Sequence, residues 1–173
     1  MTQAVAVQRS RGGLPAAAAA RLVALLLPLA LLGGALGSQY LGGLHPCEMC
    51  YWQRWPHASA IILAALAFTA PASSSRSRML TLLAAFAIGI SGMIGVYHAS
   101  VEAKVFEGFT QCTALGKGLT TADLLRQISS APLVRCDEVQ FRFLGISMAG
   151  WNAILSLGGA TLILLLSLRA RRA

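Results

Sequence analysis

Four long apolar stretches constrain this chain more than any other feature of its sequence. They cover roughly residues 20–40, 51–72, 79–101 and 147–168. A helix needs about 20 residues, at 1.5 Å each, to cross the hydrocarbon core of a bilayer, where it satisfies its own backbone hydrogen bonds. Only 12% of the residues are charged, whereas a soluble domain has about a quarter. The sequence therefore predicts an all-α membrane protein, a four-transmembrane-helix bundle that forms one domain over residues 1–173.

The charges are sorted between the two sides that this topology creates. Basic residues lie before the first stretch, between the second and third, and after the fourth: Arg9, Arg11, Arg21, Arg76, Arg78, Arg169, Arg171 and Arg172. The acidic residues fall on the other side: Glu48, Glu102, Glu107, Asp123, Asp137 and Glu138. Because cytoplasmic loops are enriched in Lys and Arg, we expect both termini in the cytoplasm and outer loops at 41–50 and 102–146. This sorting explains the net charge of +8 without nucleic acid, since no basic patch with interleaved aromatics exists.

The N-terminal stretch has a second interpretation, as a cleavable secretory signal. Arg21, a Leu-rich run and small residues up to Gly37 and Ser38 have the layout of such a signal. The run is long enough to span a bilayer, however, and its removal would leave three spans and a displaced N-terminus. We therefore expect it to be retained, which the intact mass of the purified protein would test.

All four cysteines fall in the two predicted outer loops. Cys47 and Cys50 form a Cys-x-x-Cys in the first loop, and Cys112 and Cys136 lie in the second. Paired thiols form disulfides outside the bacterial cytoplasm, so one pair in each loop is consistent with two disulfides. Between the second pair, residues 120–128 combine an initial hydroxyl, an early acid and spaced apolar residues. That pattern predicts a short amphipathic helix at the membrane surface.

The Cys-x-x-Cys is better suited to thiol–disulfide exchange than to stabilisation. A disulfide between Cys47 and Cys50 would close a very short loop, which removes little entropy from the unfolded chain and stabilises the fold poorly. Pro46 suits a first helical position, which puts both cysteines in the opening turn of the second span, where the helix dipole stabilises a thiolate. Arg54 lies one turn beyond Cys50 on the same face. An arginine just inside a span marks a functional site by default, although snorkelling to the headgroups is the alternative.

Other uses of the cysteines and histidines remain open at this point. Two structural disulfides in a non-catalytic membrane scaffold fit the same count, and they predict that Cys50→Ser leaves function intact. A zinc site is disfavoured, because only one pair has the Cys-x-x-Cys spacing and the compartment favours oxidation, so we expect no metal. A haem protein needs two facing histidines, whereas only His98 is a candidate. A protein that carries reducing equivalents across the membrane needs cysteines reachable from both sides, whereas all four are predicted here on the outer side. Labelling of Cys47 or Cys50 from the cytoplasmic side would favour that alternative.

These features together resemble a known family. The segments are Pro46-Cys-x-x-Cys-Tyr51-x-x-Arg54 at the second span, Cys112 and Cys136 in the second loop, and Phe143-Leu-Gly-Ile-x-Met148-x-x-Trp151 at the fourth span. In order and spacing they are similar to the bacterial disulfide bond formation protein B (DsbB) family over nearly the whole chain after the N-terminal tail. One departure is Glu48, where many members have an apolar residue. A carboxylate there should raise the pKa of the neighbouring thiols, which leaves the redox balance of the pair open.

The resemblance implies a thiol:quinone oxidoreductase of the bacterial inner membrane, with its reactive cysteines on the periplasmic side. A soluble thioredoxin-like partner (DsbA-like) would attack Cys112 of a Cys112–Cys136 disulfide, and Cys136 would then engage Cys47. Cys50 would be released as a thiolate facing a membrane quinone, either ubiquinone or menaquinone.

The resemblance also implies roles for two residues beside the quinone. Arg54 would stabilise negative charge on the quinone oxygen. His98 lies where members of the family often carry a histidine near the quinone, although a lone histidine near a helix end is also commonly an interfacial hydrogen-bonding residue. Membrane lipid is the other partner that we expect.

Overall fold

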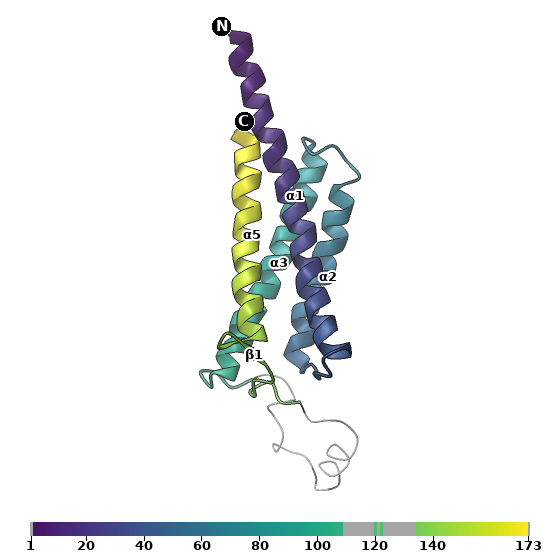
Figure 1. Cartoon of the computed structure of the whole chain (residues 1–173), viewed down its shortest axis with the longest axis vertical. Helices are drawn as coiled ribbons and strands as arrows, with labels where there is room; N and C mark the ends of the chain where they lie inside the picture. Colours follow the sequence, from purple (N-terminus) through teal and green to yellow (C-terminus); the bar gives the residue numbers. More distant parts are fainter. Residues whose placement is uncertain (1, 109–119, 121, 123–133, 173) are drawn as a thin grey trace.

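The computed structural model describes residues 2–108, 120, 122 and 134–172, which form a bundle of long helices (Figure 1). The helices of this described part are α1 (Thr2–Tyr40), α2 (Glu48–Ala67), α3 (Ser75–Glu102) and α5 (Met148–Arg172). A short antiparallel hairpin, β1 (Arg142–Phe143) and β2 (Ile146–Ser147), precedes α5. The prediction of an all-α fold is confirmed, with this hairpin as a small addition to it.

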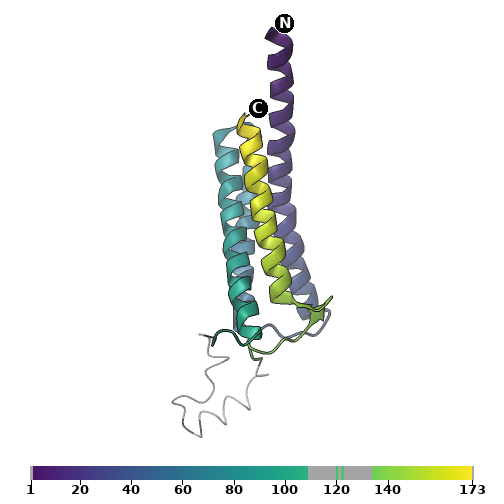
Figure 2. The same ribbon diagram turned by 90° about the vertical axis from the view of Figure 1, so that its left-hand side faces the viewer.

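The helices form a ring in which each packs on two neighbours. α1 packs on α2 and α5, and α3 packs on the same two helices, so α1 and α3 occupy opposite corners with few contacts between them. The N-terminus, the C-terminus and the α2–α3 turn lie at one end of the bundle, and the start of α2 and the hairpin lie at the other (Figures 1 and 2). The segments that carry the sorted arginines thus share one end.

Small residues bring α3 and α5 close together. A Cβ added at Gly95 would lie 3.0 Å from the backbone oxygen of Ala149 and 3.0 Å from the backbone nitrogen of Ala153. A Cβ at Gly92 would lie 2.9 Å from the Leu157 side chain. Lipid tails are as apolar as leucine, so membrane helices associate mainly through close packing of this kind. The glycines of α3 therefore set the distance between the two helices.

Three of the helices are long and apolar enough to cross a membrane by length and composition: the parts Pro15–Tyr40 of α1, Ser75–Glu102 and Met148–Arg172. α2 is less apolar because it carries Gln53, Arg54 and His57. Gln53 and His57 are buried between helices rather than turned outward. The coarse prediction of a multi-pass helical protein is confirmed, and the count of four spans stays a prediction.

The bounds of the helices differ from the predicted ones at several ends. α2 begins at Glu48 and ends at Ala67, earlier at both ends than the predicted 51–72. It continues through Pro56, which lies inside the helix. α3 begins at Ser75 rather than 79, because the Ser74 side chain caps it by accepting a hydrogen bond from the Ser77 N–H. The predicted helix at 120–128 lies outside the described residues, apart from 120 and 122.

Arg21 of α1 ties the end of α2 to the start of α3. Its guanidinium donates hydrogen bonds to the carbonyl oxygens of Ala67 and Ala70 and to Ser77 Oγ, and it lies 4.7 Å from the centre of the Phe68 ring. The last carbonyls of a helix have no partners within the helix. Arg21 therefore satisfies the end of α2 from a neighbouring helix and fixes the α2–α3 turn.

Candidate active site

The Cys-x-x-Cys begins α2. Cys47 is the N-cap residue, with an extended backbone (φ −74°, ψ 172°), and its Sγ accepts a hydrogen bond from the Cys50 N–H at 3.4 Å. Cys50 lies in the first turn, where unpaired backbone N–H groups and the helix dipole favour a thiolate. The two Sγ atoms are 3.0 Å apart, with Cys47 buried and Cys50 half-buried. The two sulfurs are thus close enough to bond through small side-chain rotations.

Cys136 is brought to the same point from a distant part of the sequence. It is fully buried, and it packs in one cluster with Cys47, Met49 and Val101. Hydrogen bonding to Cys136, then hydrogen bonding to Cys50, and burial raise the pKa of the Cys47 thiol. Cys47 therefore contacts one sulfur on each side, one from its own pair and one from the second loop. Cys112, the remaining predicted site residue, lies outside the described residues.

An ion cluster anchors the segment that carries Cys136. Asp137 accepts hydrogen bonds from Arg135 and from Lys104, which follows the end of α3. These two cations hold the pKa of the Asp137 carboxyl well below its usual range, with Arg135 contributing most. The pairing connects residues 135–137 to α3 immediately beside the buried thiol.

A cavity of about 340 Å³ opens beside the sulfurs. Its polar lining includes Cys50, Gln53, Arg54, His98 and Asn152. Its apolar lining comes largely from α1 and from the start of α5: Ala30, Leu31, Leu32, Ala35, Met148 and Ala149. A mostly apolar cavity with a few convergent polar groups is typical of a small-molecule site.

Arg54 projects across this cavity toward α1. Its guanidinium donates to Gln39 Oε1 and, at 3.2 Å, to the carbonyl oxygen of Ala35, and it lies 5.0 Å from the centre of the Tyr51 ring. The side chain is therefore held against α1, beside the cavity that Cys50 also lines.

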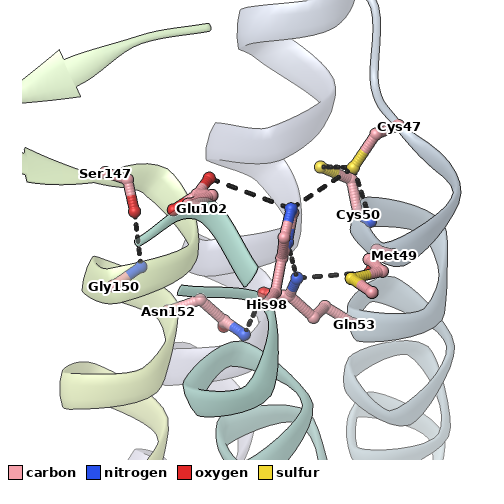
Figure 3. Close-up of polar contacts among 9 residues, drawn as sticks. All are labelled: Cys47, Met49, Cys50, Gln53, His98, Glu102, Ser147, Gly150 and Asn152. Atoms are coloured by element: carbon pink, nitrogen blue, oxygen red, sulfur yellow. Dashed lines mark hydrogen bonds and ion pairs between the residues drawn. The ribbon is translucent and has the colours of Figure 1, made fainter. Parts of the chain in front are cut away.

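His98 of α3 lies against the sulfurs rather than at a free surface (Figure 3). Its Nε2 is 3.5 Å from Cys47 Sγ and 3.8 Å from Glu102 Oε1, and its Nδ1 is 2.8 Å from Gln53 Nε2. The backbone of Cys136 also hydrogen-bonds to the His98 ring. His98 therefore joins the Cys-x-x-Cys, the Cys136 segment and the interior of the bundle.

Sequence reasoning missed a polar cluster below His98. His57 is buried, and its Nε2 is 2.9 Å from Asn152 Oδ1 and 3.0 Å from Ser91 Oγ. Asn152 also donates to Gln53 Oε1 at 2.7 Å. The available signal was the presence of Gln53, His57 and Asn152 inside apolar stretches, because polar residues in a membrane interior are costly and usually functional.

Cys47, Cys50 and His98 offer three metal-ligand atoms within 4.8 Å of one another. The spacing of the cysteines in the sequence gave no sign of this set, because the histidine comes from α3. The expectation that the site holds no metal stays a prediction, and it depends on which ring nitrogen of His98 carries a proton.

These features define a multi-pass α-helical membrane protein with three thiols gathered at one end of the bundle, beside a mostly apolar cavity. Comparison with known families is consistent with that class. The family model for the disulfide bond formation protein DsbB matches residues 17–166, and the chain belongs to this family. The family name makes it a disulfide-forming oxidoreductase of the membrane.

Individual relatives support the same assignment. The chain is 34% identical over 150 residues to the disulfide bond formation protein B of Methylococcus capsulatus, covering 84% of this chain and 90% of the relative. It is 26% identical over 156 residues to the protein of the same name from Xanthomonas oryzae pv. oryzae, covering 87% and 90%. An uncharacterized protein of Rickettsia prowazekii is 24% identical over 139 residues, 79% of each chain. No solved structure matched the chain.

Proposed function

We propose that this protein re-oxidises a periplasmic thioredoxin-like dithiol protein (DsbA-like) and passes the electrons through its two cysteine pairs to a membrane quinone. The observation that carries the proposal is the contact of Cys47 with both Cys50 and Cys136 at the edge of the cavity. A structural disulfide has no need of a third thiol at its first sulfur. An exchange reaction needs that arrangement, because the attacking thiolate must reach one sulfur of the bond that it breaks.

The order of transfer is the one that the family resemblance implies, and the contact of Cys136 with Cys47 supports its second step. The partner's thiolate attacks Cys112 and frees Cys136 as a thiolate. Cys136 attacks Cys47, a new S–S bond forms between them, and the electron pair of the broken Cys47–Cys50 bond leaves on Cys50. Because Cys50 lies in the first turn of α2 and near Arg54, its thiolate is better stabilised than that of Cys47.

The residues around the cavity fit a quinone headgroup. The apolar wall from α1 suits a ring, and the cavity volume of about 340 Å³ lies within the range of small-molecule sites. A bound quinone, either ubiquinone or menaquinone, would supply the two-electron acceptor, because thiol–disulfide exchange among the cysteines produces no net oxidation. Arg54 and Cys50 would hold its oxygen, with the guanidinium placed to stabilise negative charge there. His98 lines the same cavity and would contact the ring from the side of Cys47.

The proposed setting is the bacterial inner membrane, crossed four times, with both termini cytoplasmic and the cysteines periplasmic. The common end of the arginine-bearing segments supports this orientation (Figure 1). Labelling of Cys50 by a membrane-impermeant thiol reagent in intact spheroplasts, but not in inverted vesicles, is the expected result.

Purified protein with reduced thioredoxin-like partner and a short-chain quinone tests the activity, followed by quinone absorbance. We expect rapid quinone reduction by the wild type and near-complete loss in Cys47→Ala and Cys50→Ser. Equal rates for the wild type and Cys47→Ala would refute the proposal. Full activity of Cys50→Ser would instead favour the non-catalytic scaffold.

A further inference from the structure

A continuous chain of buried and half-buried hydrogen bonds runs from the interior of the bundle to Cys47. It passes from Asn152 of α5 to Gln53 of α2 and on to His98 of α3, and the exposed fractions of Gln53 and His98 are 7% and 3% (Figure 3). Three helices thus contribute one side chain each. The mechanism proposed above gives Gln53 and Asn152 no part.

Backbone carbonyl groups fix the orientation of both amide side chains. Gln53 Nε2 donates to the carbonyl oxygen of Met49 at 3.2 Å, and Asn152 Nδ2 donates to the carbonyl oxygen of Ser91 at 3.1 Å. A carbonyl oxygen can only accept, so the atom facing it must be the NH₂ group in each amide. The same Nδ2 of Asn152 then donates to Gln53 Oε1 at 2.7 Å, which agrees with both orientations.

These orientations settle which ring nitrogen of His98 carries a proton. Gln53 Nε2 faces His98 Nδ1 at 2.8 Å and can only donate, so Nδ1 must accept. A neutral imidazole that accepts at Nδ1 has its proton on Nε2. That Nε2–H faces Cys47 Sγ at 3.5 Å, with Glu102 Oε1 at 3.8 Å and the backbone of Cys136 as neighbouring acceptors. A metal ion would need the Nε2 lone pair, so this tautomer opposes metal binding by Cys47, Cys50 and His98.

We propose that Gln53 and Asn152 are positioning residues that hold His98 in the Nε2–H tautomer, so that it donates a hydrogen bond to Cys47 when this sulfur leaves as a thiolate. The inference rests on the proposed electron relay. In that relay Cys47 bonds to Cys136 and must be released again. A second thiolate of the relay forms a new S–S bond to Cys136, and the electron pair of the broken Cys47–Cys136 bond leaves on Cys47. This exchange involves no net loss or gain of electrons.

Cys47 already has the Cys50 N–H as a backbone donor at 3.4 Å, but the two thiols beside it oppose its ionisation, so a side-chain donor adds stabilisation that its thiolate needs. The titratable or charged groups around it come from every element packed against it: His45 and Glu48 beside it in the chain, Cys50 and Arg54 of α2, His98 and Glu102 of α3, and Arg135, Cys136 and Glu138 of the segment after residue 134. The thiols of Cys50 and Cys136 raise the pKa of Cys47. Glu102, 3.8 Å from the His98 ring, adds negative charge nearby. Among the described side chains other than the thiols, the Nε2–H of His98 is the donor that faces its sulfur.

The tautomer can be measured directly on the wild-type full-length protein. In detergent micelles with ¹⁵N-labelled histidine, long-range proton–nitrogen correlation distinguishes a protonated from a bare ring nitrogen, and loss of one spin system in His98→Gln assigns His98. We expect His98 with a bare Nδ1 and a protonated Nε2. In Gln53→Glu, whose carboxylate can accept but not donate, Nδ1 should become protonated. A wild-type His98 that is protonated at Nδ1 would overturn the proposal.

The effect on the sulfur is measured in a protein whose only thiol is Cys47, with Cys50, Cys112 and Cys136 replaced by serine. Ultraviolet absorbance of the thiolate against pH gives the midpoint of ionisation. We expect Gln53→Leu to raise this midpoint by about one unit, that is, about tenfold less thiolate at a given pH, and Asn152→Leu to raise it less. Ser59→Ala on α2 is the matched control, because Ser59 is exposed and bonds only to Trp55 of its own helix.

The outcomes separate this inference from the proposed function. An unchanged midpoint in Gln53→Leu, with helix content intact by circular dichroism, would refute the positioning role even if quinone is reduced. Neither readout uses quinone or partner protein. Absence of quinone reduction in the wild type would therefore refute the relay and leave the tautomer result standing.

Discussion

Gly95 offers a direct test of how tightly α3 and α5 pack. A Cβ placed there lies 3.0 Å from two backbone atoms of α5, Ala149 O and Ala153 N, and 3.1 Å from Asn152 Nδ2. Backbone atoms cannot rotate away as a side-chain end can. In Gly95→Ala the two helices must therefore separate by about 0.4 Å to reach the ordinary contact distance of 3.4 Å.

The cost of this separation can be set against the gain in helix propensity. Ala in place of Gly in a helix interior contributes about 1 kcal/mol. Overpacking a close contact costs about 1–3 kcal/mol, and a gap of roughly half an ångström forfeits up to about a quarter of the dispersion energy along the interface. We expect Gly95→Ala to be less stable than the wild type by about 1 kcal/mol, despite the better propensity.

Gly89 provides the matched control on the same helix. The nearest atom to a Cβ there is Ala160 Cβ at 3.9 Å, an ordinary contact, so Gly89→Ala should keep the full propensity gain and match or exceed wild-type stability. Loss of helix content on titration with a denaturing detergent, followed by circular dichroism, measures both variants. Equal stability of the two variants would refute the packing argument.

Three further results are expected. Arg54→Leu should lower the rate of quinone reduction by about tenfold or more, and Arg54→Lys should recover part of that rate, as measured by kcat and KM for the quinone. Equal kcat and KM in the two variants would contradict a role for the guanidinium. Asp137→Asn should slow disulfide exchange between the two cysteine pairs, seen by rapid quenching and mass analysis, because it loosens the segment that holds Cys136. Folding lowers the pKa of Asp137, so its stabilising contribution is fully present above the unfolded value of about 3.9 and is lost only as the pH falls through the lower folded value. Protection of residues 134–138 from proteolysis should therefore persist at pH 4. Loss of that protection above pH 5 would contradict this reasoning.

Much of the architecture follows from apolar length alone, because a helix of about 20 apolar residues has few alternatives in lipid. The position of the Cys-x-x-Cys at the start of α2 also follows locally, from Pro46 and the beginning of the apolar run. The roles of Cys112 and the other predicted site residues remain predictions, which the experiments above address.

The interior of the site could not be predicted in the same way. Whether Gln53, His57 and Asn152 face one another depends on the rotation of α2 and α5 about their axes, which side-chain packing between the helices sets, for α5 partly at Gly95 of α3. The contact of Cys136 with Cys47 depends on a pairing across the bundle end that Lys104 and Asp137 hold in place. Neither the facing of these polar side chains nor the contact between Cys136 and Cys47 produces a recognisable spacing in the sequence. The presence of polar residues inside apolar stretches was the available signal.

The inward-facing polar side of α2 has a consequence for how the chain enters the membrane. A helix bearing Gln53, Arg54 and His57 partitions poorly into lipid by itself, because polar and charged side chains oppose its insertion. α2 and α3 are joined by only a short turn, and α3 supplies partners for its polar groups. During biosynthesis the two would leave the translocon most readily as a helical hairpin, with α1 already in place to receive Arg54.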